Sequence, residues 1–162
     1  MAYSFSQAQV DVASTILRVG REMSVTDLQM KAAFAAAWVE SRMRNLNYGD
    51  RDSLGVFQQR PSQGWGTPAQ IMNVDYAARK FFEGAKRVSQ SGTFGQVAQR
   101  VQRSAFPNRY DEQSAAPLEL LGRLAGGSSP LPSTDSLFGE MSTEKALMIG
   151  AVGLVVLLLI TE

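Results

Sequence analysis

The residue best suited to chemistry in this sequence is Glu40. It follows a run of eight consecutive apolar residues, Ala32 to Val39, and such a run predicts a helix that is apolar on every side and therefore buried. A carboxylate in the last turn of a buried helix loses hydration and faces the negative end of the helix dipole, and both effects raise its pKa. A general acid for glycosidic cleavage requires a carboxyl group that stays protonated near neutral pH. We therefore predict that Glu40 is the catalytic acid.

The amino-acid composition leaves few other kinds of chemistry. The chain has 162 residues with no histidine and no cysteine, which excludes Ser-His and Cys-His nucleophiles, zinc sites built on those ligands, and disulfides. We expect no metal and no cofactor. Residues 1–112 carry 14 Lys and Arg against 10 Asp and Glu, a net charge of +4 that suits an anionic cell wall. No compact basic patch with interleaved aromatic residues is visible, so nucleic acid is not an expected partner.

The segment that follows the acid carries a family resemblance. Glu40 is followed by Ser41, and after a polar, turn-rich stretch comes the block Ser53-Leu54-Gly55-Val56-Phe57-Gln58. The two blocks resemble the Glu-Ser and Gly-Leu-Met-Gln signatures of lytic transglycosylases with the lysozyme-like fold. The extension Arg60-Pro61-Ser62-Gln63-Gly64-Trp65-Gly66 resembles a branch of that family found among phage and Gram-positive wall-degrading proteins. The resemblance covers about residues 8–112.

The resemblance implies cleavage of the bond between N-acetylmuramic acid and N-acetylglucosamine in peptidoglycan. Glu40 would protonate the glycosidic oxygen and then withdraw the proton of the muramic 6-hydroxyl, which gives a 1,6-anhydro product. The resemblance also implies substrate contacts at Ser41, at Ser53 and at Gly55, whose backbone would approach the glycan closely. Gln58 matches the family's active-site glutamine, and a plain strand-edge position is its structural alternative.

One family motif is missing from this sequence. In the family, an Ala-Tyr-Asn motif packs across the cleft from the acid, and here Val101-Gln102-Arg103-Ser104 stands in its place. Gln102, Ser104 and Tyr110 are therefore the expected substitutes for the usual asparagine contact. Trp65 lies in a loop flanked by glycines, and it is expected either to stack on a sugar face or to anchor its loop against the domain.

Two aspartates leave the type of reaction open. Asp50 and Asp52 follow the acid by ten and twelve residues. In an inverting hydrolase a second carboxylate activates water across the sugar, whereas a lytic transglycosylase needs one acid that later acts as the base. A lysozyme-type muramidase, with Asp50 or Asp52 holding water, is thus the nearest alternative. In the structural alternative, Asp50 caps the turn after Gly49 and Asp52 anchors the loop.

The rest of the N-terminal part predicts the elements that position this site. Apolar spacing and capping residues predict helices over 6–23, 27–41, 67–72, 75–88 and 94–104. Residues 53–59 predict a tight loop and a short strand, which belongs to a short β-hairpin. The expected fold class is mainly α, in the α+β lysozyme-like form.

The composition changes after about residue 112. Residues 113–143, rich in Pro, Gly and Ser, predict a flexible linker with one or two helical turns inside it. Residues 146–160 are fifteen uncharged apolar residues, about 23 Å of helix against a hydrocarbon core of about 30 Å. We expect a transmembrane helix over 144–162, with a buried soluble helix as the alternative. The catalytic domain is expected over 1–112.

A wall enzyme with a membrane segment and no readable signal peptide poses a question of topology. Membrane-containing phages resemble this arrangement, so the expected location is a virion membrane, with a bacterial cell membrane as the alternative. The expected partners are peptidoglycan glycan strands, the lipid bilayer through residues 144–162, and other virion proteins. From a different functional class, the alternatives are a catalytically dead glycan-binding or structural virion membrane protein and a protein that makes membrane lesions.

Overall fold

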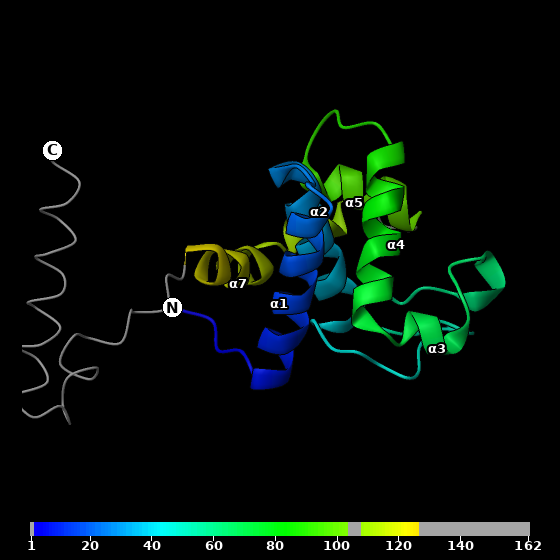
Figure 1. The fold of residues 1–162 in the computed structure, drawn as a ribbon. Coiled ribbons are helices and arrows are strands. Elements are labelled where there is room, and N and C mark those ends of the chain that lie inside the picture. Colours follow the sequence, from blue (N-terminus) through cyan, green and yellow to red (C-terminus); the bar gives the residue numbers. More distant parts are fainter. Residues whose placement is uncertain (1, 104–107, 127–162) are drawn as a thin grey trace, which may run out of the picture. The chain divides into compact units, whose positions relative to one another are not determined.

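The described part of the chain, residues 2–103 and 108–126, is mainly helical in this computed structural model (Figure 1). In chain order the helices are α1 (Gln7–Glu22), α2 (Asp27–Ser41), the 3-10 turn η1 (Pro61–Gln63), α3 (Pro68–Ile71), α4 (Val74–Arg87), α5 (Phe94–Gln102), α6 (Arg109–Glu112) and α7 (Ala115–Gly126). No strand occurs among these described residues. The mainly helical class predicted from the sequence is confirmed.

Several helices begin with the same capping box. A Ser or Thr hydroxyl accepts a hydrogen bond from the backbone N–H three residues on, and a Gln side chain there accepts one from the cap residue's own N–H. The cap residues are Ser6, Thr26, Thr67 and Thr93. The helix starts predicted at Ser6, Thr26 and Thr67 are confirmed. Helix α4 begins at Val74, one residue before the predicted Asp75, because Asn73 serves as its cap.

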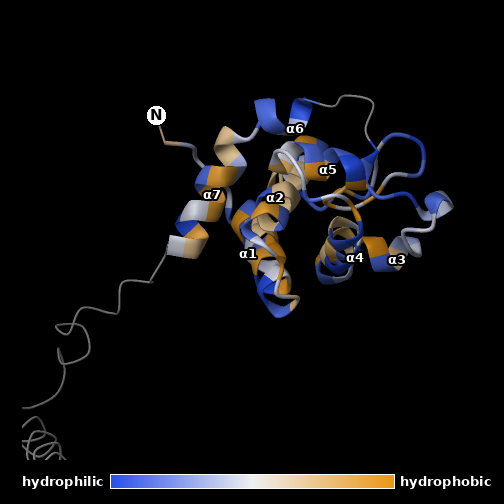
Figure 2. Cartoon of the chain, turned by 90° about the horizontal axis from the view of Figure 1, so that it is seen from above, coloured by the Kyte–Doolittle hydropathy of each residue, from blue (hydrophilic) through white to orange (hydrophobic). Residues whose placement is uncertain are grey.

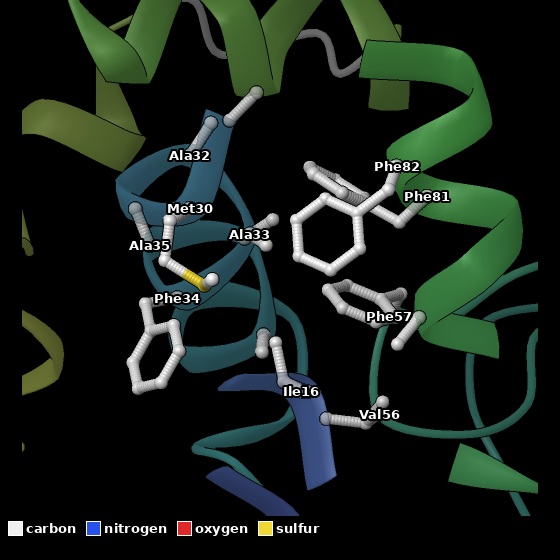
Figure 3. Packing of buried hydrophobic residues seen from close by; sticks show 14 of the residues in the cluster. Ile16, Met30, Ala32, Ala33, Phe34, Ala35, Val56, Phe57, Phe81 and Phe82 are labelled. Atoms are coloured by element: carbon white, nitrogen blue, oxygen red, sulfur yellow. The ribbon is translucent and has the colours of Figure 1, made fainter. Parts of the chain in front are cut away.

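Helix α2 is the centre of the core. Its residues from Ala32 to Ala37 are fully buried, as the apolar run predicts, and it contacts α1, α4, α5, α6 and α7. Aromatic side chains from α4 and from the loop after α2 pack beside it (Figure 3). Phe57 of that loop stacks on Phe81 of α4 with ring centroids 4.8 Å apart, and Phe82 meets Phe81 edge-on. This packing fixes the loop that follows the acid against the core.

The predicted strand over 53–59 does not form. Leu54 and Gln59 make a single antiparallel bridge, in which each backbone N–H donates to the other's carbonyl oxygen at 2.9 Å. Between them, Gly55 (φ 76°) and Gln58 (φ 49°) have left-handed backbone conformations, which an extended strand does not contain. The expected β-hairpin is therefore reduced to one closed turn.

The predicted domain boundary at residue 112 is wrong. Residues 115–126 form α7, which contacts α1 and α2 and buries Leu120 and Leu121 in the common core. Hydrophobic and hydrophilic residues alternate along this helix (Figure 2). The compact unit ends at Gly126, so the predicted linker over 113–143 begins too early. Each fully buried leucine stabilises a fold by about 1.5–3 kcal/mol, and a chain cut at residue 112 would lose both.

The remainder of the predicted linker and the predicted transmembrane helix over 144–162 lie outside the described residues. Within residues 2–103 and 108–126, no helix is both long enough and apolar enough to cross a bilayer.

Candidate active site

Glu40 lies in the last turn of α2 with its side chain partly buried. Its Oε1 accepts a hydrogen bond of 2.6 Å from the hydroxyl of Tyr110 in α6, and Tyr110 itself is fully buried. Burial raises the pKa of Glu40 above the ordinary value, while the Tyr110 hydrogen bond and the charge of Arg109 lower the pKa and only partly compensate. The loss of hydration is the dominant cause, in agreement with the sequence-based expectation.

The chain reverses sharply after the acid. Arg42 (φ 56°) and Met43 (φ 59°) both have left-handed backbone conformations. Their N–H groups donate to the carbonyl oxygens of Trp38 at 2.8 Å and Ala37 at 3.0 Å. For residues other than glycine this region costs about 1–3 kcal/mol each, so the surrounding packing must hold the reversal. Met43 is fully buried, and its packing fixes the end of α2 on which Glu40 stands.

Ser41 fastens the following loop to α2. Its Oγ lies 2.8 Å from the carbonyl oxygen of Val56 and 3.0 Å from that of Ala37, and it accepts a bond of 3.1 Å from the N–H of Arg44. The residue is 3% exposed. The hydroxyl expected to contact substrate is therefore occupied by bonds inside the protein, and it holds the turn at Val56 beside the acid.

Gly55 is required by a close approach within the protein. A Cβ at this position would lie 2.7 Å from the carbonyl oxygen of Ile71 in α3, and the φ of 76° favours glycine as well. The close approach predicted toward a glycan is thus made to α3.

Gln58 and Ser53 make hydrogen bonds within the loop that follows the acid. The Nε2 of Gln58 donates to the carbonyl oxygens of Tyr48 at 3.2 Å and Gly55 at 3.1 Å. Ser53 is buried, and its N–H donates to the carbonyl oxygen of Asp50 at 3.0 Å. Both residues, predicted as substrate contacts, hold the loop in its closed shape.

The two aspartates differ in their surroundings. Asp52 accepts bonds from Nε of Arg60 at 2.6 Å and from the N–H of Ser62 at 2.8 Å. The bonds from Ser62, and then that from Arg60, hold the pKa of Asp52 well below its usual range. The Asp50 side chain is 92% exposed, with the guanidinium of Arg51 at 3.9 Å. Asp52 therefore anchors the loop, and Asp50 closes its turn through the backbone carbonyl and not through the side chain.

Gln102 and Trp65 line one groove, of about 720 Å³, between α4, α5 and the loop after Arg60. The Nε2 of Gln102 donates to the carbonyl oxygen of Phe57 at 2.9 Å, so α5 is fastened to the loop that follows the acid. Trp65 also packs against the core. Ser104, the third residue predicted on this side, lies outside the described residues.

The sequence did not reveal the partner of the acid. Tyr110 was predicted to contact substrate, whereas its hydroxyl binds Glu40 across a separation of 70 residues. The arginines of the groove were also not predicted, although Arg100 lies on the helix that carries Gln102 and Arg103 is the C-cap of that helix.

A carboxyl group with a raised pKa and a neutral hydrogen-bond donor can donate a proton to an ether oxygen and later accept one. No cluster of three or more His, Cys, Asp or Glu side chains suited to a metal ion occurs in the described ranges. No protein-family model matches the chain, and a search of the curated proteins found no match.

Proposed function

We propose that this protein is a peptidoglycan lytic transglycosylase with a lysozyme-like fold, in which Glu40 acts as both acid and base. The environment of Glu40 carries the proposal: a partly buried carboxyl group with a raised pKa, bound at 2.6 Å by the buried Tyr110 hydroxyl. The resemblance of Glu40-Ser41 and of the block from Ser53 to Gln58 to the family's signatures supports the same function.

The reaction proceeds in two steps at the muramic residue. Glu40 first donates its proton to the glycosidic oxygen as the bond from that oxygen to the muramic C1 breaks, so the N-acetylglucosamine side leaves with a new hydroxyl. The Glu40 carboxylate then takes the proton of the muramic 6-hydroxyl while O6 bonds to C1 and closes the 1,6-anhydro ring. Water is not consumed, and Glu40 ends protonated. Tyr110 stabilises the carboxylate between the two steps, because hydrogen bonds to a charged acceptor are stronger.

The state of the two aspartates favours this reaction over hydrolysis. An inverting hydrolase needs a second carboxylate that is available to activate water. Asp52 is occupied by Arg60 and Ser62, and Asp50 points into solvent. These contacts support a mechanism with one carboxyl group, and a lysozyme-type muramidase is the alternative that the products would reveal.

The same proposal extends to the setting of the enzyme. Its substrate is the glycan strand of peptidoglycan, and it needs no cofactor. Residues 144–162 anchor it in a membrane, which we propose to be that of a virion that must open a host wall. The apolar, uncharged run over 146–160 supports this anchor.

Product analysis tests the proposed reaction. The full-length protein is incubated with purified peptidoglycan, and the released muropeptides are analysed by mass spectrometry, with Glu40→Gln as the matched control. We expect anhydro-muramic ends, each lighter by one water than the corresponding hydrolysis product, and strongly reduced release by the control. Reducing ends would identify a muramidase. The absence of any release by the parent protein would overturn the proposal.

A further inference from the structure

The groove between α4 and α5 is positively charged, and this charge has no role in the proposed proton transfer at Glu40. Four guanidinium groups line it, from Arg60, Arg87, Arg100 and Arg103, and none of the described residues that line it is an Asp or a Glu. Its volume of about 720 Å³ falls within the range of about 300–1,000 Å³ that is usual for ligand sites. The groove is therefore suited in size and charge to an anionic group.

Two of the four arginines are occupied by the protein. Arg60 binds Asp52, and Arg100 donates to the carbonyl oxygens of Ser89 at 3.0 Å and Ser91 at 2.8 Å. These bonds fix their guanidinium groups in the wall of the groove.

The other two arginines are available. Arg87 ends α4 and Arg103 is the C-cap of α5, and both side chains are exposed. Neither guanidinium group makes a hydrogen bond or an ion pair with the residues that the structure describes. A guanidinium group binds a carboxylate through two parallel hydrogen bonds, so this pair provides donors for one or two carboxylates.

The groove is connected to the acid by short links. Gln102, in the groove wall, binds the carbonyl oxygen of Phe57. The neighbouring Val56 carbonyl is bound by Ser41, the residue after Glu40. A glycan strand that binds with one sugar at Glu40 and continues along the loop of Val56 and Phe57 would bring its next substituents toward the groove.

We propose that the groove binds the carboxylates of the peptide stems that the muramic residues of the glycan carry. This inference rests on the proposed function and names the part of the substrate that the groove recognises. The sugar rings themselves are uncharged, whereas each stem is acidic, so the stems are the anionic groups of the strand that lie closest to the cleavage site. A nucleic acid fits less well, because it requires an extended basic surface with aromatic residues interleaved, and here the charge is confined to one groove with Trp65.

A binding experiment tests this assignment without turnover. The full-length Glu40→Gln protein is titrated with short glycan strands that carry their stems and with the same strands after an amidase has removed the stems and the lactyl carboxylates exposed in this way have been converted to amides. Arg87→Gln and Arg103→Asn are then added together. Asn suits position 103, because the backbone there is left-handed at φ 52° and Asn tolerates that region.

We expect the preference for strands with stems, expressed as the ratio of the two Kd values, to fall by about tenfold to a hundredfold, the effect of one or two charge-assisted hydrogen bonds. The charge-matched control is Arg21→Gln with Lys31→Gln, because neither residue lines the groove. It should leave the ratio within error of the parent value.

Two results would overturn the assignment. One is a ratio that stays the same in the groove variant, whether or not both strands lose affinity, and the other is a single-stranded oligonucleotide that binds more tightly than the strand with stems. Failure of the proposed function has a different signature: the parent protein would cleave neither strand, while the titration would still report whether the groove prefers stems.

Discussion

Glu22 and Glu40 occupy equivalent places in neighbouring helices and have opposite electrostatic surroundings. Each lies in the last turn of its helix, α1 or α2, where the helix dipole disfavours a negative charge by about 0.3–1 kcal/mol. The pKa of Glu22 is nevertheless lowered, first by its bond to Arg79 and then by its bond to Arg18. The pKa of Glu40 is raised by burial. The groups around each carboxylate therefore decide whether its pKa is raised or lowered, and the helix dipole has the smaller effect.

Glu22 belongs to a network of ion pairs that joins α1 to α4. Arg18 binds both Glu22 and Asp75, and Arg79 binds the same two carboxylates. The pKa of Asp75 is also lowered, chiefly by Arg18. Exposed ion pairs of this kind contribute little to stability. The comparison shows two uses of a carboxyl group: charged and paired at the surface, or partly desolvated and bound by a neutral hydroxyl at the candidate site.

The largest expected effect comes from replacing the desolvated acid. Glu40→Gln should lower turnover on peptidoglycan by about 10²- to 10⁴-fold, the usual contribution of a general acid. Because the native pKa lies above the ordinary 4.5, the native state holds more protons than the unfolded state between those two values, and the parent protein loses stability as pH rises through that interval. The variant should not show this loss. Melting temperatures measured from pH 4 to 8, with Glu22→Gln as the control, check it. Unchanged turnover would contradict the assignment.

A smaller effect is expected from Tyr110→Phe, which removes the hydroxyl and keeps the ring. The Tyr110 bond lowers the pKa of Glu40, so its loss should raise that pKa further. Turnover should fall roughly tenfold, because the carboxylate loses a hydrogen bond made to a charged group.

The pH profile separates this positioning role from a merely structural one. Turnover is lost as pH rises through the pKa of the protonated acid, so the alkaline limb of the profile should move to higher pH in Tyr110→Phe. A profile that keeps its alkaline limb while turnover falls would show that the hydroxyl acts only through packing.

Asp52→Asn should have a modest effect on the reaction. The Asn side chain can still accept the bond from the Ser62 N–H but cannot pair with the charge of Arg60, so the loop is weakened and the melting temperature falls. Cleavage should stay within about tenfold of the parent, and mass spectrometry should still find anhydro-muramic products. Complete loss of turnover in a folded variant, together with reducing ends from the parent, would assign the protein to the hydrolases.

The smallest effect should come from Glu22→Gln. The native pKa of Glu22 is lowered, so its ion pairs with Arg79 and Arg18 contribute stability above the ordinary pKa of 4.5. This contribution is lost as pH falls below that value. Turnover should be unchanged, and the small loss of melting temperature at neutral pH should disappear at about 1 M salt, where exposed charges are screened. A loss of activity here would mean that the two carboxyl groups are coupled and that the comparison fails.

Local signals in the sequence predicted most of the helical framework. The capping residues and apolar periods of α1, α2 and α3 involve neighbours within four residues, and these were sufficient for their bounds. Helix α7 was predicted only as one or two helical turns inside a linker, because its leucines lie in a Pro- and Gly-containing stretch and only contact with α1 and α2 gives them a core. The prediction of a strand over 53–59 was wrong because Gly55 and Gln58 form a turn, which the alternation of apolar and polar residues does not reveal.

The candidate site was predictable only in its central residue. The apolar run before Glu40 indicates desolvation directly. The roles of Ser41, Gly55 and Asp52 depend on partners such as Val56, Ile71 and Ser62, which are brought to them by a loop whose shape no periodic pattern encodes. The bond from Tyr110 spans 70 residues and depends on the packing of α6 against α2.

The capping boxes have a consequence for behaviour in acid. At Ser6, Thr26, Thr67 and Thr93 the reciprocal partner is a glutamine, where a glutamate would serve equally well in geometry. An amide neither gains nor loses a proton, so these helix starts keep their bonds when the medium turns acidic, and the chain has no histidine to respond in their place. The capping bonds of the helices therefore do not titrate, and the response of the chain to acid comes from its carboxyl groups, Glu40 and Glu22 among them.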